Sequence, residues 1–298
     1  MRSFQVMLSK FYVALARLVV AVHMGAKETG DASAIMEKVA ANVAQTVEAR
    51  RHYVYKQRVV ATVARSDGKI SCKETSEYTV VPQESTTEKT LTRFAGECRD
   101  GNRMVPHSEP GAGRRNDHAD SAIVDELVDG LVNAKGSRDG IPHSLFPLGP
   151  DELKYYKFSL KGETVLQGRR VFDIRFEPSE VRDLCIHVGG DEDNPCHQWK
   201  GEVWIDMQEF QPVRIHTEMA KGVPWGVRLF LGINIRQLGF SVTYLRAGEG
   251  AWFPASYGAE FRITVLWGYK RTITLAMDNS EFRRTDASST IQFDGPPE

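Results

Sequence analysis

The residues whose type and spacing suggest chemistry are, first, the four cysteines of this 298-residue chain. An even number of cysteines favours disulfide bonds in an exported protein, and the N-terminus considered below favours export. If residues 69–81 and 87–97 form a hairpin, Cys72 and Cys98 come opposite each other, at a separation that a disulfide can bridge. The sequence therefore predicts a disulfide between Cys72 and Cys98.

The second pair, Cys185 and Cys196, frames a polar loop and leaves three alternatives open. With His187 and His197 it offers two thiols and two imidazoles, which is a ligand set of structural zinc sites. However, adjacent cysteine and histidine residues are awkward ligands for one ion, and the acidic residues 191–193 lack the ligand order of a calcium loop. A disulfide is favoured over free thiols and over a metal site, so we expect a Cys185–Cys196 bond and no metal or other cofactor.

The histidines and carboxylates form no catalytic pattern. His216 lies among charged residues of a predicted strand, and a pair such as Asp206 and Glu218 arises by chance in a chain with 39 acidic residues. The sequence contains no nucleophile elbow, phosphate-binding loop, zinc-protease helix or dinucleotide-binding glycine pattern. We therefore expect a protein that is not an enzyme.

The elements that must position any site are mainly β-strands. Residues 201–207 and 213–219 alternate between apolar and polar side chains, and the short polar link 208–212 suits a hairpin. The same alternation recurs between residues 156 and 177, and the whole chain holds about ten such strands. The apolar side chains that we expect to line the interior, and to bind a ligand there, are Tyr156, Phe158, Phe172, Ile174, Phe176, Val203, Ile205, Val213 and Ile215.

Two amphipathic helices are predicted to cover this sheet. Apolar residues recur every four positions within 31–50, and a second stripe runs from residue 119 to 135. The second helix follows a Gly- and Pro-rich loop at 99–118, so it is either a movable lid or a permanently docked helix. The predicted fold class is mainly β with two covering helices (α+β), built on a curved antiparallel sheet or incomplete β-barrel.

The ends of the chain are predicted to lie outside this fold. Basic residues, an apolar run and a small pair follow one another within residues 1–26, which is the order of a secretory signal segment; the alternative is an amphipathic helix of a cytoplasmic protein. The Ser-, Asp- and Pro-rich residues 286–298 indicate a disordered tail. Residues 27–285 remain as a single predicted domain.

Charge and hydropathy exclude some partners. The chain carries 38 basic and 39 acidic residues, so its net charge of −1 gives no reason to expect a nucleic-acid partner. No segment approaches the roughly 20 consecutive apolar residues that a transmembrane helix requires. We therefore expect no transmembrane span. Together with the signal-like N-terminus, this favours a periplasmic or secreted location.

One motif resembles a known family. The run Gly201–Asp206, GEVWID, is followed by Pro212–Ile215, PVRI, after an amphipathic helix and an aromatic strand that opens at Tyr53. This order, over residues 31–283, is similar to the periplasmic lipoprotein-sorting family of the LolA/LolB type. The resemblance implies an incomplete barrel closed by helices, whose apolar interior carries acyl chains. This chain departs from the family in its greater length, its loop at 99–118 and its two possible disulfides.

The expected function follows from the resemblance and from the cost of exposing an apolar face. Each large apolar side chain left in water forfeits roughly 1.5–3 kcal/mol of burial, so an incompletely covered face favours a lipid ligand. We expect a periplasmic, non-enzymatic protein that carries or senses a lipid or an acylated lipoprotein. The alternative is an exported structural or signalling module whose barrel is filled by its own side chains and which binds an envelope protein.

Overall fold

A computed structural model describes most of the chain. The described residues are 28–83, 87–110, 119–132, 139–142, 145–180, 199–220, 234–236, 238–248, 250–265 and 268–285. The predicted signal segment 1–26, the tail 286–298 and the second cysteine pair, Cys185 and Cys196, lie outside these residues. Within the described ranges, no helix combines the length and the apolar character needed to cross a membrane.

The chain divides into two compact units, which share the first helix, α2 (Glu28–Arg50). Residues up to Val43 and residues 148–222 form unit 1, and the remaining residues form unit 2. Both units are built mainly from antiparallel strands, and the described residues hold twelve of them. The predicted fold class, mainly β with covering helices and a curved antiparallel sheet, is confirmed.

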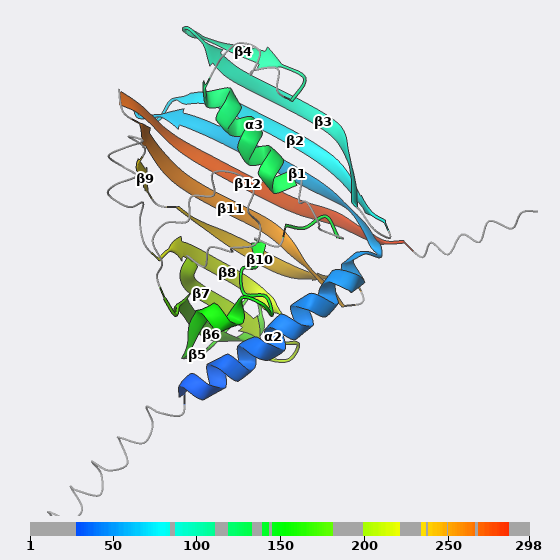
Figure 1. Cartoon of the computed structure of the whole chain (residues 1–298). Helices are drawn as coiled ribbons and strands as arrows, with labels where there is room; N and C mark the ends of the chain where they lie inside the picture. The colour runs from blue at the N-terminus through cyan, green and yellow to red at the C-terminus, as the bar shows by residue number, and fades with distance from the viewer. Residues whose placement is uncertain are drawn as a thin grey trace, which may run out of the picture. The chain divides into compact units, whose positions relative to one another are not determined.

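Unit 2 holds the larger part of the sheet, in the order β4-β3-β2-β1-β12-β11-β10, with β9 paired to β11 (Figure 1). Register shifts in the pairs β1–β12, β1–β2, β2–β3 and β10–β11 mark bulges, which increase the local twist and bend a sheet. Helix α3 (Ala119–Val132) packs against β1 and β2. The strands of this unit are β1 (Tyr53–Arg65), β2 (Ile70–Pro82), β3 (Thr87–Asp100), β4 (Arg103–His107), β9 (Asn234–Arg236), β10 (Gly239–Ala247), β11 (Ala251–Val265) and β12 (Tyr269–Arg284).

Unit 1 combines the first part of α2 with a meander in the order β8-β7-β6-β5. A short 3₁₀ helix, η3 (Leu153–Tyr155), leads into the first strand. The strands are β5 (Tyr156–Leu166), β6 (Arg169–Pro178), β7 (Trp199–Asp206) and β8 (Pro212–Met219). The hairpin predicted from residues 201–219 is therefore β7 and β8, paired from Trp199 with Met219 to Ile205 with Pro212.

The tight turns follow from local residue chemistry. Gly68 closes the β1–β2 hairpin at φ 80°, a left-handed conformation that costs glycine little, and the Asp67 carboxylate accepts a 3.1 Å hydrogen bond from the Lys69 amide. Gln167 and Gly168 both have positive φ between β5 and β6. This is the geometry of a two-residue hairpin turn.

The loop predicted at 99–118 is partly wrong. Strand β3 continues to Asp100, and residues 103–107 form β4, which pairs with β3 from Asp100–Arg103 to Gly96–His107. Gly101, at φ 56°, allows the chain to reverse directly after Asp100. The Gly and Pro residues of this segment indicated a loop, but Pro106 lies on a strand at the end of the strand order, where a missing amide donor is tolerated.

Candidate functional site

The apolar side chains predicted to line the interior lie together on the strands of unit 1. Pairing places Phe158 opposite Phe176, Phe172 opposite Ile205, and Ile174 opposite Val203, which is itself opposite Ile215. Successive residues of a strand alternate between its two faces, so these pairs occupy one face of the meander. We call the predicted set the apolar face: Tyr156, Phe158, Phe172, Ile174, Phe176, Val203, Ile205, Val213 and Ile215.

Burial is not uniform across the apolar face. Ile174, Phe176, Val203, Ile205, Val213 and Ile215 are fully buried, and Tyr156 and Phe158 are buried as well. Phe172 is only half-buried. Its ring lies 6.2 Å from the ring of Phe210, another half-buried aromatic residue, in the turn between β7 and β8. The apolar face is therefore most accessible at Phe172, beside Phe210.

Helix α2 contacts the same end of the apolar face. The Asn42 amide donates hydrogen bonds to the carbonyl oxygens of Glu209, at 2.9 Å, and Phe210, at 3.4 Å. The Lys38 ammonium lies 4.9 Å from the centre of the Phe210 ring, within the range of a cation–π interaction. In the part of the helix up to Val43, the buried residues are Ala32, Ile35, Met36, Val39 and Ala40.

The apolar face carries no charge at physiological pH. Its one ionisable member is Tyr156, whose pKa is raised to about 12 because burial disfavours the phenolate; a hydrogen bond with the Trp199 backbone partly opposes that rise. The hydroxyl group therefore stays protonated. A ligand of this face would be held by hydrocarbon contacts, with polar groups available at its Lys38 end.

Asp206, Glu218 and His216 of the β7–β8 hairpin have neighbours that give them structural roles. Asp206 is buried, accepts hydrogen bonds from the Gln208 and Glu209 amides, and pairs with Arg169 at 3.1 Å. Glu218 lies near the other end of the hairpin, opposite Lys200. His216 is 46% exposed and lies 3.9 Å from Glu218. Asp206 and Glu218 are therefore not a catalytic pair.

In unit 2, helix α3 is held at both ends. The Asp120 carboxylate accepts hydrogen bonds from the Tyr269 hydroxyl and from Arg271 Nε, the latter at 2.8 and 2.9 Å. At the other end, the Lys89 ammonium donates a 2.6 Å hydrogen bond to the Val132 carbonyl. Desolvation of Lys89 lowers its pKa to about 8. A lid motion of this helix requires that at least one of these attachments break.

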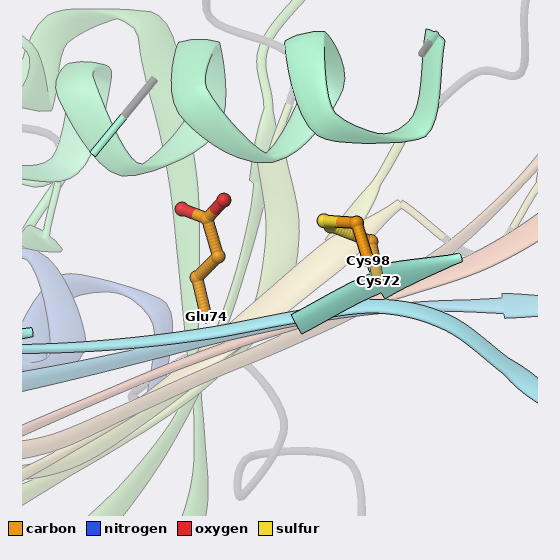
Figure 2. A group of neighbouring side chains, drawn as sticks. All are labelled: Cys72, Glu74 and Cys98. Atoms are coloured by element: carbon orange, nitrogen blue, oxygen red, sulfur yellow. A yellow bond between two sulfur atoms is a disulfide. The ribbon is translucent and has the colours of Figure 1, made fainter. Parts of the chain in front are cut away.

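The predicted Cys72–Cys98 disulfide is present, and the two residues lie directly opposite each other on β2 and β3. Beside it, on the same face of the sheet, is the Glu74 side chain (Figure 2). The Glu74 carboxylate lies 2.9 Å from His107 Nε2. Cys72, Glu74, Cys98 and His107 are called the cysteine–histidine cluster below.

Sequence reasoning missed this cluster because it placed His107 in a loop. The register explains the contact: Glu74 is opposite Gly96, and Gly96 is opposite His107. A Cβ atom on Gly96 would overlap the His107 ring. Glycine at this position therefore leaves the room that the ring needs to contact the Glu74 carboxylate. The available signal was the two-residue spacing of Cys72 and Glu74 together with Gly96, two residues before Cys98.

Comparison with known proteins gives structural likenesses only. No known family matches the sequence, and no curated protein matches it. Among solved structures, the chain is similar to an outer membrane lipoprotein-sorting protein domain from Vibrio parahaemolyticus, with 13% identity and a TM-score of 0.36 over 85% of this chain and 94% of that one.

Two further structures are similar over comparable lengths. A DUF1329 family protein from Desulfovibrio piger has 12% identity and a TM-score of 0.28, over 84% of this chain and 94% of that one. The MucA/MucB complex from Pseudomonas aeruginosa gives 13% identity and a TM-score of 0.24, over 84% and 99%. The lipoprotein-sorting domain belongs to the kind of protein that the sequence motif resembles. Identities and TM-scores this low carry no function from those proteins to this chain.

Proposed function

We propose that this protein binds the hydrocarbon chain of a lipid or of an acylated protein at the apolar face of unit 1, without catalysing a reaction. The observation that carries the proposal is the unequal burial of that face. Its centre is fully buried, whereas Phe172 and its neighbour Phe210 are half-buried at one end. An acyl chain entering between these rings would reach a surface made of aromatic and branched aliphatic side chains, as lipid sites require.

In this proposal, α2 covers part of the apolar face and the bound acyl chain covers the rest. Its buried residues between Ala32 and Ala40 are apolar, and Lys38 and Asn42 contact the turn that carries Phe210. A bound acyl chain would displace part of this helix contact, and the exchange of one apolar partner for another costs little because both bury similar surface. Lys38 would then lie near an anionic head group or a carbonyl oxygen of the ligand.

The experiment is a titration of the delipidated protein with a fluorescent fatty acyl probe. We expect saturable binding, and Phe172→Asn is expected to weaken it about tenfold or more, since a contact worth about 1.5 kcal/mol changes the binding constant by that factor. Val165→Asn is the matched control: it makes a similar apolar-to-polar change on β5 at a side chain that is 66% exposed, and is expected to leave binding unchanged. Ile205→Ala tests the buried centre, with its folded state checked by circular dichroism.

The alternative function, binding of an envelope protein by a self-filled fold, is favoured by a different observation. The centre of the apolar face is fully buried by the chain itself. Among the described residues, β5 pairs only with β6 and ends the strand order, which leaves its other edge for an added strand from a partner. Absence of saturable probe binding to folded, delipidated protein would contradict the lipid proposal and favour this one.

A further inference from the structure

The cysteine–histidine cluster combines side chains that ligate transition metals. The Sγ atoms of Cys72 and Cys98 and a Glu74 carboxylate oxygen lie within 4.8 Å of one another. His107 Nε2 is 2.9 Å from the same carboxylate. Two thiolates, a carboxylate and an imidazole form a ligand set for zinc, whose tetrahedral bonds of about 2.0–2.3 Å require donor atoms some 3.3–3.8 Å apart. The two sulfur atoms and the Glu74 oxygen need only small shifts to reach one ion, whereas His107 lies outside that 4.8 Å group and its ring must rotate toward the sulfur atoms to become the fourth ligand.

Burial makes the cluster a built site rather than a surface group of charges. Cys72 and Cys98 are 0% and 6% exposed, and the side chains of Glu74 and His107 are 3% and 11% exposed. Figure 2 shows Cys72, Glu74 and Cys98 projecting from one face of the sheet toward the helix above them. The donors come from three adjacent strands whose register is fixed by backbone pairing, so the backbone that carries them is in place before any ion binds.

The charge around Glu74 also favours a cation. Glu74 is buried, and the Asp125 carboxylate of α3 lies close enough to interact with it electrostatically. A buried carboxylate near a second acidic group gains most from a divalent ion. Reduction of the disulfide would add two thiols to the same place, which ionise readily only beside a positive charge.

We propose that the cysteine–histidine cluster binds one Zn²⁺ ion when the disulfide is reduced and releases it when a small-molecule disulfide, itself reduced to two thiols, oxidises Cys72 and Cys98 back to the bond. A dithiol reductant transfers two electrons and two protons to the disulfide, giving two protein thiols and the cyclic disulfide of the reductant. Zinc binding then releases both thiol protons to solvent, while the carboxylate and the neutral imidazole supply the remaining ligands. This site lies in unit 2 and contains no residue of the apolar face.

The test uses the full chain with Cys185→Ser and Cys196→Ser, so that only Cys72 and Cys98 supply thiols. The protein is reduced with a phosphine, which becomes a phosphine oxide with oxygen taken from water, and is dialysed against Zn²⁺ or Co²⁺. We expect one ion bound per reduced chain, measured by elemental mass spectrometry, and thiolate-to-cobalt charge-transfer absorption. The oxidised chain is expected to bind none.

Variants assign the ligands. Glu74→Gln and His107→Ala are expected to lower the zinc affinity of the reduced chain by about tenfold or more, as is usual when a metal site loses a supporting group. Gly96→Ala tests whether zinc binding depends on the position of the His107 ring, because the added methyl group pushes the ring aside without removing a ligand. His216→Ala is the control, since it removes a histidine that also has a glutamate neighbour but lies on β8.

Two results would overturn the proposal. The first is a reduced chain that binds no more zinc than the oxidised one, with circular dichroism showing both folded. The second is an affinity that Glu74→Gln, His107→Ala and Gly96→Ala all leave at the value of the control.

Discussion

Gly201 shows how one residue sets the shape of the apolar face. It lies opposite Phe176 on β6 and Thr217 on β8. A Cβ atom at this position would collide with the backbone carbonyl of His216, which cannot rotate away as a side chain could. Glycine therefore permits the close approach of β7 and β8 beside the Phe176 ring.

Gly201→Ala is expected to destabilise the protein by about 1–3 kcal/mol, because a methyl group forced into a filled space moves the backbone. The measurement is the midpoint of urea unfolding. Gly258→Ala on β11 is the control, since its Cβ atom would meet nothing within 4 Å, and it is expected to leave the midpoint unchanged or slightly higher. An equal effect of the two substitutions would contradict this account of Gly201.

The ion pair between Arg50 and Asp139 is the second decisive feature at this scale. Arg50 Nε lies 2.6 Å from the carboxylate, and the two side chains are 8% and 3% exposed. Arg50 also donates a 3.0 Å hydrogen bond to the Trp252 carbonyl, and the Tyr55 hydroxyl donates one to the Asp139 carbonyl. These bonds join the end of α2 to the segment that follows α3.

Asp139→Asn is expected to destabilise unit 2 by about 3–5 kcal/mol, because it leaves the Arg50 guanidinium buried without its counter-charge. Lys56→Met is the control: it removes an ion pair with Glu281 whose partners are 58% and 46% exposed, and it is expected to change the unfolding midpoint little. Thermal unfolding of the three proteins in parallel checks both expectations. A loss for Asp139→Asn as small as that for Lys56→Met would show that the buried pair contributes little.

Among the elements, α3 depends on its N-terminal attachment. Burial alone would raise the pKa of Asp120, but hydrogen bonds from Ser71, Tyr269 and Arg271 outweigh it and leave the pKa below its ordinary value. A carboxyl group whose pKa is lower in the folded state stabilises the fold above the unfolded-state pKa. This contribution is lost as the pH falls through the lowered value.

Asp120→Asn is therefore expected to lower stability at pH 7 by about 1.5–3 kcal/mol, which is the usual worth of hydrogen bonds to a charged group. Wild type should lose this advantage over the variant as the pH falls below the ordinary carboxyl range. Urea unfolding from pH 7 to pH 3 measures the difference. Asp129→Asn, at an exposed position of the same helix, is the comparison, and a pH profile like that of Asp120→Asn would argue against the attachment.

Much of the element structure was predictable because its signals are local. The alternation in residues 201–207 and 213–219 predicted β7 and β8, and the short polar link 208–212 predicted the hairpin that joins them. Strand β4 was not predictable in this way, because Pro106 and Gly101 are loop signals and the strand is stabilised by pairing with β3. Tertiary pairing overrode the local preference there.

At the scale of the whole molecule, the residues of the apolar face could be predicted from the alternation of side chains along the strands. Contacts between segments that are distant in the sequence could not. The Lys38–Phe210 contact and the Glu74–His107 pair join residues whose separation in sequence hides them from any periodic pattern. The difference in burial between Phe172 and Ile174 could not be predicted either, because both residues are apolar and both lie on the same face of the strand. Such differences depend on which element covers each residue.

The central claim is that the apolar face holds an acyl chain, and its most direct test is mass analysis of the lipid that accompanies the protein. The protein would be purified without detergent from the envelope of a producing cell and extracted with organic solvent. We predict acyl lipid in a fixed ratio to wild-type protein and to Val165→Asn, and a clear loss in Phe172→Asn. Wild-type protein that carries no more acyl lipid than Phe172→Asn, at the level of a blank extraction, would contradict the account.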